Sequence, residues 1–289
     1  MMEESILGYW NTNPCGEQLV GGPSSDELHH YEEFFDRYDA LKYGIESHIP
    51  ACLNKLNLTN RQVLEIGLGQ GAEAEQLIKR GALWTGVDIT ETSVQRTRIR
   101  MNLRGLPFQG IHRASVLDLP FPDDSFDVVF SHGVLHHVPD IEQAQREICR
   151  VLKPGGELVV MLYSRWSLNY LVAIGLVRRA AVLLSYPIVR MRGNKSNGRL
   201  ADHIGTAHRR GLFKYLRMGQ FIHHNTDGPA NPYSRVYDLR RVRADFSSFV
   251  VNGAEKRFMH APPLPVHGFP GERVLGWHLW VRLTPRKCQ

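Results

Sequence analysis

The chain has 289 residues, of which 43% are hydrophobic and 22% charged, the composition of an ordinary soluble protein long enough to bury a sizeable core. Its four cysteines are far apart and form no CxxC pair, which excludes zinc-knuckle and thioredoxin-like sites. The net charge of +6 is uneven, because residues 165–217 hold eleven Lys/Arg and one Asp and so carry +10, while the remainder carries −4. This local excess suggests an anionic partner or interface.

The first 60 residues are predicted to form an N-terminal helical cap. Residues 1–23 read as irregular, because Asn, Pro and Gly interrupt them, and the first ten residues lack the apolar run of a signal peptide. Helical patterns follow at 31–41 and 47–56. With reduced thiols expected for the cysteines, the protein is predicted to be cytoplasmic.

Short apolar runs alternate with helical patterns from Gln62 onward. Strands are predicted over 63–66, 84–87, 110–113, 126–130 and 158–163, separated by helices over 72–80, 92–103 and 141–152. Because this alternation produces parallel β-α-β units, residues 61–165 are predicted to be a Rossmann-like, doubly wound α/β core. Residues 237–289 are predicted to complete it with a helix over 238–250 and closing strands over 256–260 and 277–283.

Residues 166–236 break this rhythm and are predicted to be an inserted, mainly helical lid or substrate region. Its apolar tract, 168–189, is divided by Arg178 and Arg179 into halves of about ten residues, each too short to cross about 30 Å of hydrocarbon. A helix apolar around most of its circumference should be buried. We favour a lid over the substrate pocket; a second subunit and an anionic membrane interface are the alternatives.

A glycine-rich loop follows the first predicted strand, with the sequence Glu65-Ile66-Gly67-Leu68-Gly69-Gln70-Gly71. Asp88 ends the next strand, where its carboxylate can accept hydrogen bonds from both hydroxyls of a ribose. Together these features indicate an adenosine-type cofactor. They leave an NAD-dependent oxidoreductase open, because Gly67-x-Gly69-x-x-Ala72 also satisfies the dinucleotide-binding pattern.

Four segments, in order and at normal spacing, resemble the class I S-adenosylmethionine (SAM)-dependent methyltransferases that act on small molecules. They are VLEIGLGQG, GVDIT, SVLDLPFPDDSFDVVFSHGVLHHVPD and REICRVLKPGGELVV. The resemblance covers residues 62–163 and, more diffusely, 238–283. It implies a mostly parallel seven-stranded sheet with an antiparallel closing pair, and it implies SAM as the cofactor, with S-adenosylhomocysteine as the product.

The resemblance also implies cofactor-binding roles for individual residues. Those expected at the methionine and methyl end are Glu65, Gly67, Gly69, Gly71, Ser131 and His132. Those expected at the adenosine end are Asp88 for the ribose and Ile89, Asp118 and Leu119 for the adenine. Tyr38 lies in a segment that resembles the family's cofactor-covering helices.

An oxygen acceptor usually needs a base, for which histidine is suited at neutral pH. His137 follows the fourth strand and matches a family position that often faces the active site. The insertion contains a polar, turn-rich segment, residues 223–235, that is too elaborate for a simple linker. Its residues His223, Tyr233 and Arg235 are therefore expected to reach the acceptor pocket. No metal site is expected, because no carboxylate stands at ligand spacing beside His136 and His137.

The sequence therefore predicts an enzyme that moves a methyl group from SAM by in-line displacement to an oxygen or nitrogen atom of a small-molecule metabolite or natural-product intermediate. Carbon and sulfur acceptors stay open, as do lipid-linked and RNA substrates, although no RNA-binding motif is visible. The alternatives from other classes are an NAD-dependent oxidoreductase and a non-catalytic SAM- or RNA-binding module. An anionic or lipid-linked acceptor, peripheral membrane contact and a homodimer through the insertion are the partners considered.

Overall fold

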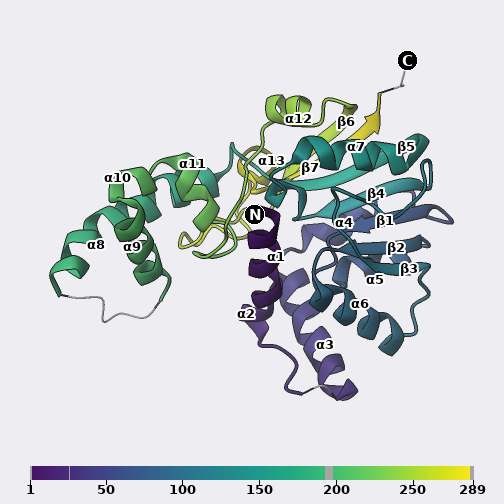
Figure 1. Ribbon diagram of the computed structural model, residues 1–289, viewed down its shortest axis with the longest axis horizontal. Helices are drawn as coiled ribbons and strands as arrows, with labels where there is room; N and C mark the ends of the chain where they lie inside the picture. The colour runs from purple at the N-terminus through teal and green to yellow at the C-terminus, as the bar shows by residue number, and fades with distance from the viewer. Residues whose placement is uncertain (1, 26, 193–197, 287–289) are drawn as a thin grey trace.

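A seven-stranded sheet lies at the centre of the computed structural model, which describes residues 2–25, 27–192 and 198–286 (Figure 1). Its strand order is β3-β2-β1-β4-β5-β7-β6. Neighbours from β3 to β5 are parallel, whereas β7 lies antiparallel between β5 and β6. The strands are β1 (Gln62–Ile66), β2 (Leu83–Asp88), β3 (Gly110–Arg113), β4 (Phe126–His132), β5 (Leu152–Tyr163), β6 (Phe249–Arg257) and β7 (His278–Pro285). The predicted Rossmann-like fold with an antiparallel closing pair is confirmed.

Helices cover both faces of this sheet, because successive strand residues point to opposite sides. Val63 and Leu64 of β1, for example, belong to two different buried clusters. One cluster packs against α4 (His48–Leu53), α5 (Ala72–Ile78) and α6 (Glu91–Leu103). The other packs against α7 (Ile141–Val151) and α12 (Leu239–Asp245). Strands buried on both faces explain why the sequence shows continuous apolar runs there.

The N-terminal segment is helical, which corrects the irregular structure predicted for residues 1–23. Helix α1 (Met2–Thr12) buries Ile6 and Tyr9, which are three residues apart and therefore on one face. The short α2 (Glu17–Val20) follows, and α3 (Leu28–Ile45) buries Phe34, Phe35 and Tyr38. The asparagines, prolines and glycines that suggested a loop begin at Asn11, so they end α1 and do not prevent it.

In the C-terminal region, the predicted helix is too long and the predicted strand begins too late. The helix expected over 238–250 ends at Asp245, and the strand expected from 256 begins earlier, at Phe249. Residues 249–251, Phe-Val-Val, pair with β7 as an edge strand, which suits their β-branched and aromatic side chains. A short helix, α13 (Glu272–Leu275), lies between β6 and β7.

The residues between β5 and β6 form a helical lobe beside the sheet, on the left of Figure 1. Its first helix is continuous, because the π-helix η2 (Asn169–Arg178) runs directly into α8 (Arg179–Arg192). The expectation that the two arginines divide the apolar tract into halves too short to cross a membrane is therefore wrong: residues 169–189 form one 21-residue helical span that is long and apolar enough to do so by length and composition. The remaining helices of the lobe are α9 (Arg199–Arg210), α10 (Leu212–Tyr215), α11 (Met218–Phe221) and η3 (Ile222–His224).

Candidate active site

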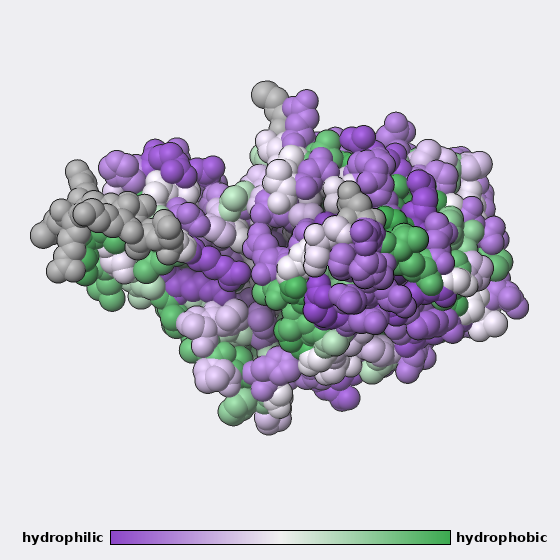
Figure 2. Space-filling model, turned by 90° about the horizontal axis from the view of Figure 1, so that it is seen from below, coloured by the Kyte–Doolittle hydropathy of each residue, from purple (hydrophilic) through white to green (hydrophobic). Residues whose placement is uncertain are grey.

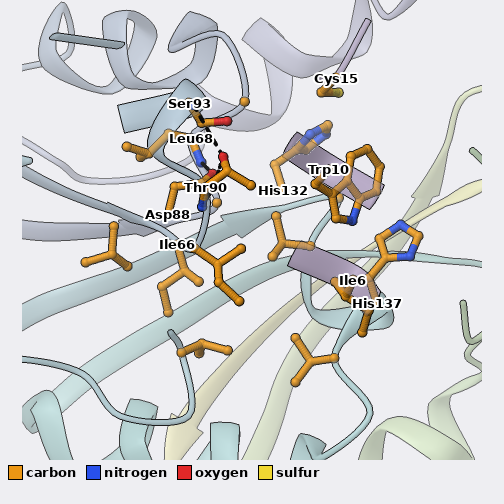
Figure 3. A pocket seen from close by; sticks show the side chains of 18 of the residues that line it. Ile6, Trp10, Cys15, Ile66, Leu68, Asp88, Thr90, Ser93, His132 and His137 are labelled. Atoms are coloured by element: carbon orange, nitrogen blue, oxygen red, sulfur yellow. Dashed lines mark hydrogen bonds between the residues drawn. The ribbon is translucent and has the colours of Figure 1, made fainter. Parts of the chain in front are cut away.

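A pocket opens at the carboxyl ends of β1, β2 and β4, with α1 lying across it (Figure 3). The carboxyl edge of a parallel sheet is where ligands bind in open α/β folds. Seven of the fifteen side chains predicted for the site line this pocket: Tyr38, Gly67, Gly69, Asp88, Ile89, His132 and His137. Residues from four separate parts of the chain therefore meet here, as the sequence predicts for a cofactor site.

The glycine loop turns sharply between β1 and α5. Gly67 and Gly69 adopt positive φ angles of 83° and 53°, which favour glycine. A Cβ atom on Gly67 would lie 2.1 Å from a methyl group of Val134, whereas one on Gly69 would meet only Cys15, at 3.7 Å, and would otherwise project into open space. Gly69 thus leaves room for a ligand to approach the backbone, and Gly67 allows the loop to pack on the chain after β4.

Asp88 is held by the same loop at the end of β2. One carboxylate oxygen accepts hydrogen bonds from the backbone N–H of Leu68 at 2.7 Å, and the other accepts from the N–H and hydroxyl of Thr90 at 2.8 Å each. Burial raises the pKa of Asp88, an effect that these hydrogen bonds oppose. These three bonds occupy three of the four acceptor sites of the carboxylate, so the group is fixed in position, and a ribose would use the remaining site on Oδ2 or replace one of the loop donors.

The part of the pocket expected to hold the adenine is lined by residues other than the predicted ones. Asp118 is exposed and does not line the pocket. Leu119 is buried in the core and does not line the pocket, and its N–H is bonded to Glu147. The lining comes instead from the three residues just before Asp118, which are Ser115, Val116 and Leu117.

Glu65, Gly71 and Ser131 were predicted as direct ligands of the cofactor, but none of them lines the pocket. Glu65 is fully buried and accepts a hydrogen bond from the indole of Trp84 at 2.8 Å. A Cβ on Gly71 would crowd Thr97 and Arg100, so this glycine permits helix packing. The buried hydroxyl of Ser131 donates to the carbonyl of Ile66 at 3.1 Å, which joins the ends of β1 and β4. These residues support the pocket wall from behind.

Helix α1 closes the pocket with residues that the sequence analysis missed. Glu3, Ile6 and Trp10 line it, and Figure 3 shows Ile6 and Trp10 facing the loop that carries Asp88. The hydroxyl of Ser115 donates to Glu3. The spacing of Ile6, Tyr9 and Trp10 was the available signal, because positions i, i+3 and i+4 share one side of a helix.

Charged groups surround the opposite end of the pocket. Lys42 and Glu73 line it and form an ion pair at 2.7 Å, with both side chains less than 15% exposed. His132 lies 3.6 Å from the same carboxylate oxygen. Burial opposes the ionisation of Glu73, but Lys42 and His132 lower its pKa overall. The pair offers one positive and one negative group to the ends of a bound amino acid.

The raised pKa of Glu46, near the same end of the pocket, should make the stability of the protein depend on pH. Burial raises its pKa to about 7, although Lys42 opposes the shift. The folded state therefore keeps a proton that the unfolded chain loses, so this stabilising contribution is full below pH 4.5 and is lost as the pH rises through 7. Glu46→Gln, a mimic of the protonated form, should gain free energy of unfolding relative to wild type between those pH values, measured by urea unfolding. A difference that is constant with pH would contradict this.

His137 follows β4 in the chain, lines the pocket, and contacts an acidic residue of the insertion, Asp227. Its Nδ1 lies 2.7 Å from the carbonyl oxygen of Tyr233, which can only accept, so Nδ1 carries the proton. Its Nε2 faces Oδ2 of Asp227 at 3.2 Å. Burial opposes the ionisation of Asp227, but His137 lowers its pKa overall.

Asp227 is itself held by two tyrosines. The hydroxyl of Tyr163, at the end of β5, donates to Oδ1 of Asp227 at 2.8 Å, and the hydroxyl of Tyr9 in α1 donates to its carbonyl oxygen at 2.5 Å. The ring of Trp10 packs edge-on against His137, with centroids 5.3 Å apart. Helix α1, the sheet and the insertion therefore all contact one histidine–carboxylate pair. The sequence could not show this pair, because its two members are 90 positions apart.

His223, Tyr233 and Arg235 do not reach the pocket through their side chains, which corrects their predicted roles. His223 stacks on Tyr233 and bonds to the backbone of Ser234. Arg235 forms an ion pair with Asp245 at 2.8 Å. The segment was correctly singled out as ordered, but its contributions to the site are the backbone of Tyr233 and the carboxylate of Asp227.

Two groups of side chains beside the pocket bring three ligand-type atoms within 4.8 Å of one another. One contains His136, His137 and Asp227, and the other contains Glu46, His132 and His278. The sequence argument against a metal considered only carboxylates close to the histidines in the chain, whereas folding brings Asp227 to them. The prediction that the reaction needs no metal is therefore not tested by this structure and stays a prediction.

Comparison with known proteins gives the family. Residues 64–160 match the family model described as a methyltransferase domain. The fatty-acid O-methyltransferase of Mycolicibacterium smegmatis is 32% identical over 151 residues, which are 52% of this chain and 48% of the relative. Residues 64–160 are therefore a methyltransferase domain similar to those of the class I SAM-dependent methyltransferases. Its cofactor is therefore SAM, and Asp88, the open space at Gly69 and the Lys42–Glu73 pair fit the ribose, backbone approach and amino-acid ends of that molecule.

Other relatives also match only part of the chain. A demethylmenaquinone methyltransferase of Tropheryma whipplei is 40% identical over 104 residues, 36% of this chain and 42% of the relative. The chain thus matches less than half the length of these curated relatives. Magnesium protoporphyrin IX methyltransferase from Synechocystis, solved with bound S-adenosylhomocysteine, shares the fold at a TM-score of 0.53 and 13% identity, with 99% of this chain and all of that chain covered.

Proposed function

We propose that this methyltransferase transfers the methyl group of SAM to an oxygen or nitrogen atom of a small, largely apolar acceptor. When bound, SAM supplies an electrophilic methyl group, so the protein needs chiefly to position the acceptor, exclude water and remove a proton. The observation that carries the proposal is the pair formed by His137, which lines the pocket, and Asp227 behind it, 3.2 Å apart.

The tautomer of His137 makes it a base. With hydrogen on Nδ1, the lone pair of Nε2 points toward Oδ2 of Asp227, 3.2 Å away, and neither atom has another hydrogen-bond partner among the described residues. As the acceptor oxygen or nitrogen bonds to the methyl carbon, its proton passes to this pair and is held between Nε2 and Oδ2. The sulfur keeps the electron pair of the broken bond, so the sulfonium becomes a neutral thioether and charge balances.

The apolar nature of the acceptor is supported by the surroundings of this pair. Trp10 and Tyr163 pack on His137, and Tyr163 stacks on Trp277 at 4.4 Å. Several curated relatives carry names of methyltransferases for fatty acids, demethylmenaquinone and sterols. An apolar acceptor with one nucleophilic atom suits a site with one base among aromatic rings.

The test combines binding with turnover. Calorimetry with SAM and NADH side by side should show binding of SAM alone, because the pocket belongs to a methyltransferase fold. Incubation with methyl-labelled SAM and a panel of long-chain fatty acids, quinols and sterols, with polar amines as the comparison set, should place label in the organic extract. Tight SAM binding without label transfer to any acceptor would favour a non-catalytic SAM-binding module.

A further inference from the structure

The first helix of the insertion exposes an apolar stripe along one side. Leu176, Leu183, Leu184 and Ile188 are 64%, 45%, 70% and 52% exposed. Ala180 and Pro187 are exposed between them. Counted from Leu176, the six positions are i, i+4, i+7, i+8, i+11 and i+12, which fall on one face of a helix. In Figure 2, green apolar surface borders purple hydrophilic surface on this lobe, at the left end of the molecule.

The opposite side of this helix is fixed to the protein. Ala173, Ile174 and Val182 are buried, and α8 packs on α9. The guanidinium group of Arg178 donates to the carbonyl oxygens of Asn225 at 2.8 Å and Pro262 at 2.7 Å. The stripe is therefore held outward by contacts on its other side.

Basic side chains accompany the stripe on the neighbouring helices. Arg209, Arg210, Lys214 and Arg217 are exposed, and within the described ranges no ion pair joins them to a carboxylate. Phe213, 79% exposed, stands among them. Apolar and aromatic side chains next to unpaired basic ones are the composition of helices that lie in the headgroup region of a membrane.

We propose that this face of the insertion docks the enzyme on an anionic lipid surface, with the stripe in the headgroup region and the basic side chains on lipid phosphates. The charge of +10 over residues 165–217 argues for this occupant. Two copies joined through the stripe would bring two such charges together, and the phosphates of a nucleic acid would leave the leucines exposed to water.

The docking face also connects to the active site. Arg178 binds the carbonyl of Asn225, two residues before Asp227, so the helix that meets the lipid also orders the segment that carries the acidic partner of His137. If the acceptor is apolar, as the proposed function states, it would reach the pocket from the lipid surface. The docking itself does not depend on that function.

Vesicle sedimentation tests the proposal with the full chain. We expect binding to vesicles of equal phosphatidylglycerol and phosphatidylcholine, little binding to phosphatidylcholine alone, and a fall in binding as salt is raised from 0.05 to 0.5 M, values chosen around a Debye length of about 10 Å. The double variant Leu183→Gln/Leu184→Gln should lower the partition coefficient by about tenfold, and Arg209→Gln/Arg210→Gln by a similar factor.

The matched control is Leu19→Gln/Val274→Gln, which removes two apolar side chains of equal or greater exposure from other surfaces and should bind vesicles like wild type. Calorimetry with SAM shows that each variant is folded. Failure of the wild type to bind anionic vesicles would overturn the proposal, as would undiminished binding by the Leu183/Leu184 variant. A wild-type dimer that this variant converts to a monomer would assign the stripe to a second copy instead. None of these outcomes alters the SAM and label-transfer results that test the proposed function.

Discussion

Asp88→Ala is expected to raise the Kd for SAM by about 10- to 100-fold, equivalent to about 1.4–2.8 kcal/mol. The carboxylate is positioned by Leu68 and Thr90 and is the group expected to accept from the ribose. Its removal deletes the bond or bonds to the ribose and also releases the loop amide of Leu68. Isothermal titration calorimetry measures the change directly.

Asp118→Asn is the matched control for this prediction. The sequence pattern assigned Asp118 to the adenine, whereas the structure places it on the surface outside the pocket, so its Kd for SAM should stay within about twofold of wild type. A wild-type Kd for Asp88→Ala would contradict the ribose assignment. An equally large loss in Asp118→Asn would restore the sequence-based role of that residue.

Asp227→Asn is expected to lower kcat for methyl transfer by about 100-fold, with the Kd for SAM and the KM for the acceptor nearly unchanged. The amide keeps a carbonyl oxygen to accept from Tyr163, but it gives no negative charge to the imidazolium that forms when His137 takes the acceptor's proton. The rate is followed as release of S-adenosylhomocysteine with an acceptor found in the label-transfer panel.

Asp202→Asn serves as the control, because Asp202 is an exposed acid of the same insertion, on α9. It should turn over like wild type. A wild-type kcat in Asp227→Asn would remove the histidine–carboxylate pair from the reaction. A selective rise in the Kd for SAM would instead place Asp227 in the cofactor site.

The central sheet was largely predictable from the sequence because its signals are local. The apolar runs at 63–66 and 126–130, the glycines after the first strand and the acid at the end of the second depend on neighbours a few residues away. Such signals fail where tertiary pairing decides. The run 249–251 became a strand because β7 was there to pair with it, and helix α1 is stabilised by the pocket that it covers.

The sequence by itself determined the fold class, the glycine loop and Asp88, since each is written within one β-α-β unit. Only the tertiary structure decided which acid meets His137, which residues replace Asp118 at the pocket wall, and that the apolar tract of the insertion is one helix with an open face. The physical reason is distance along the chain. The contact between His137 and Asp227, or the exposure of Leu184, depends on how whole elements pack, and no local pattern records it.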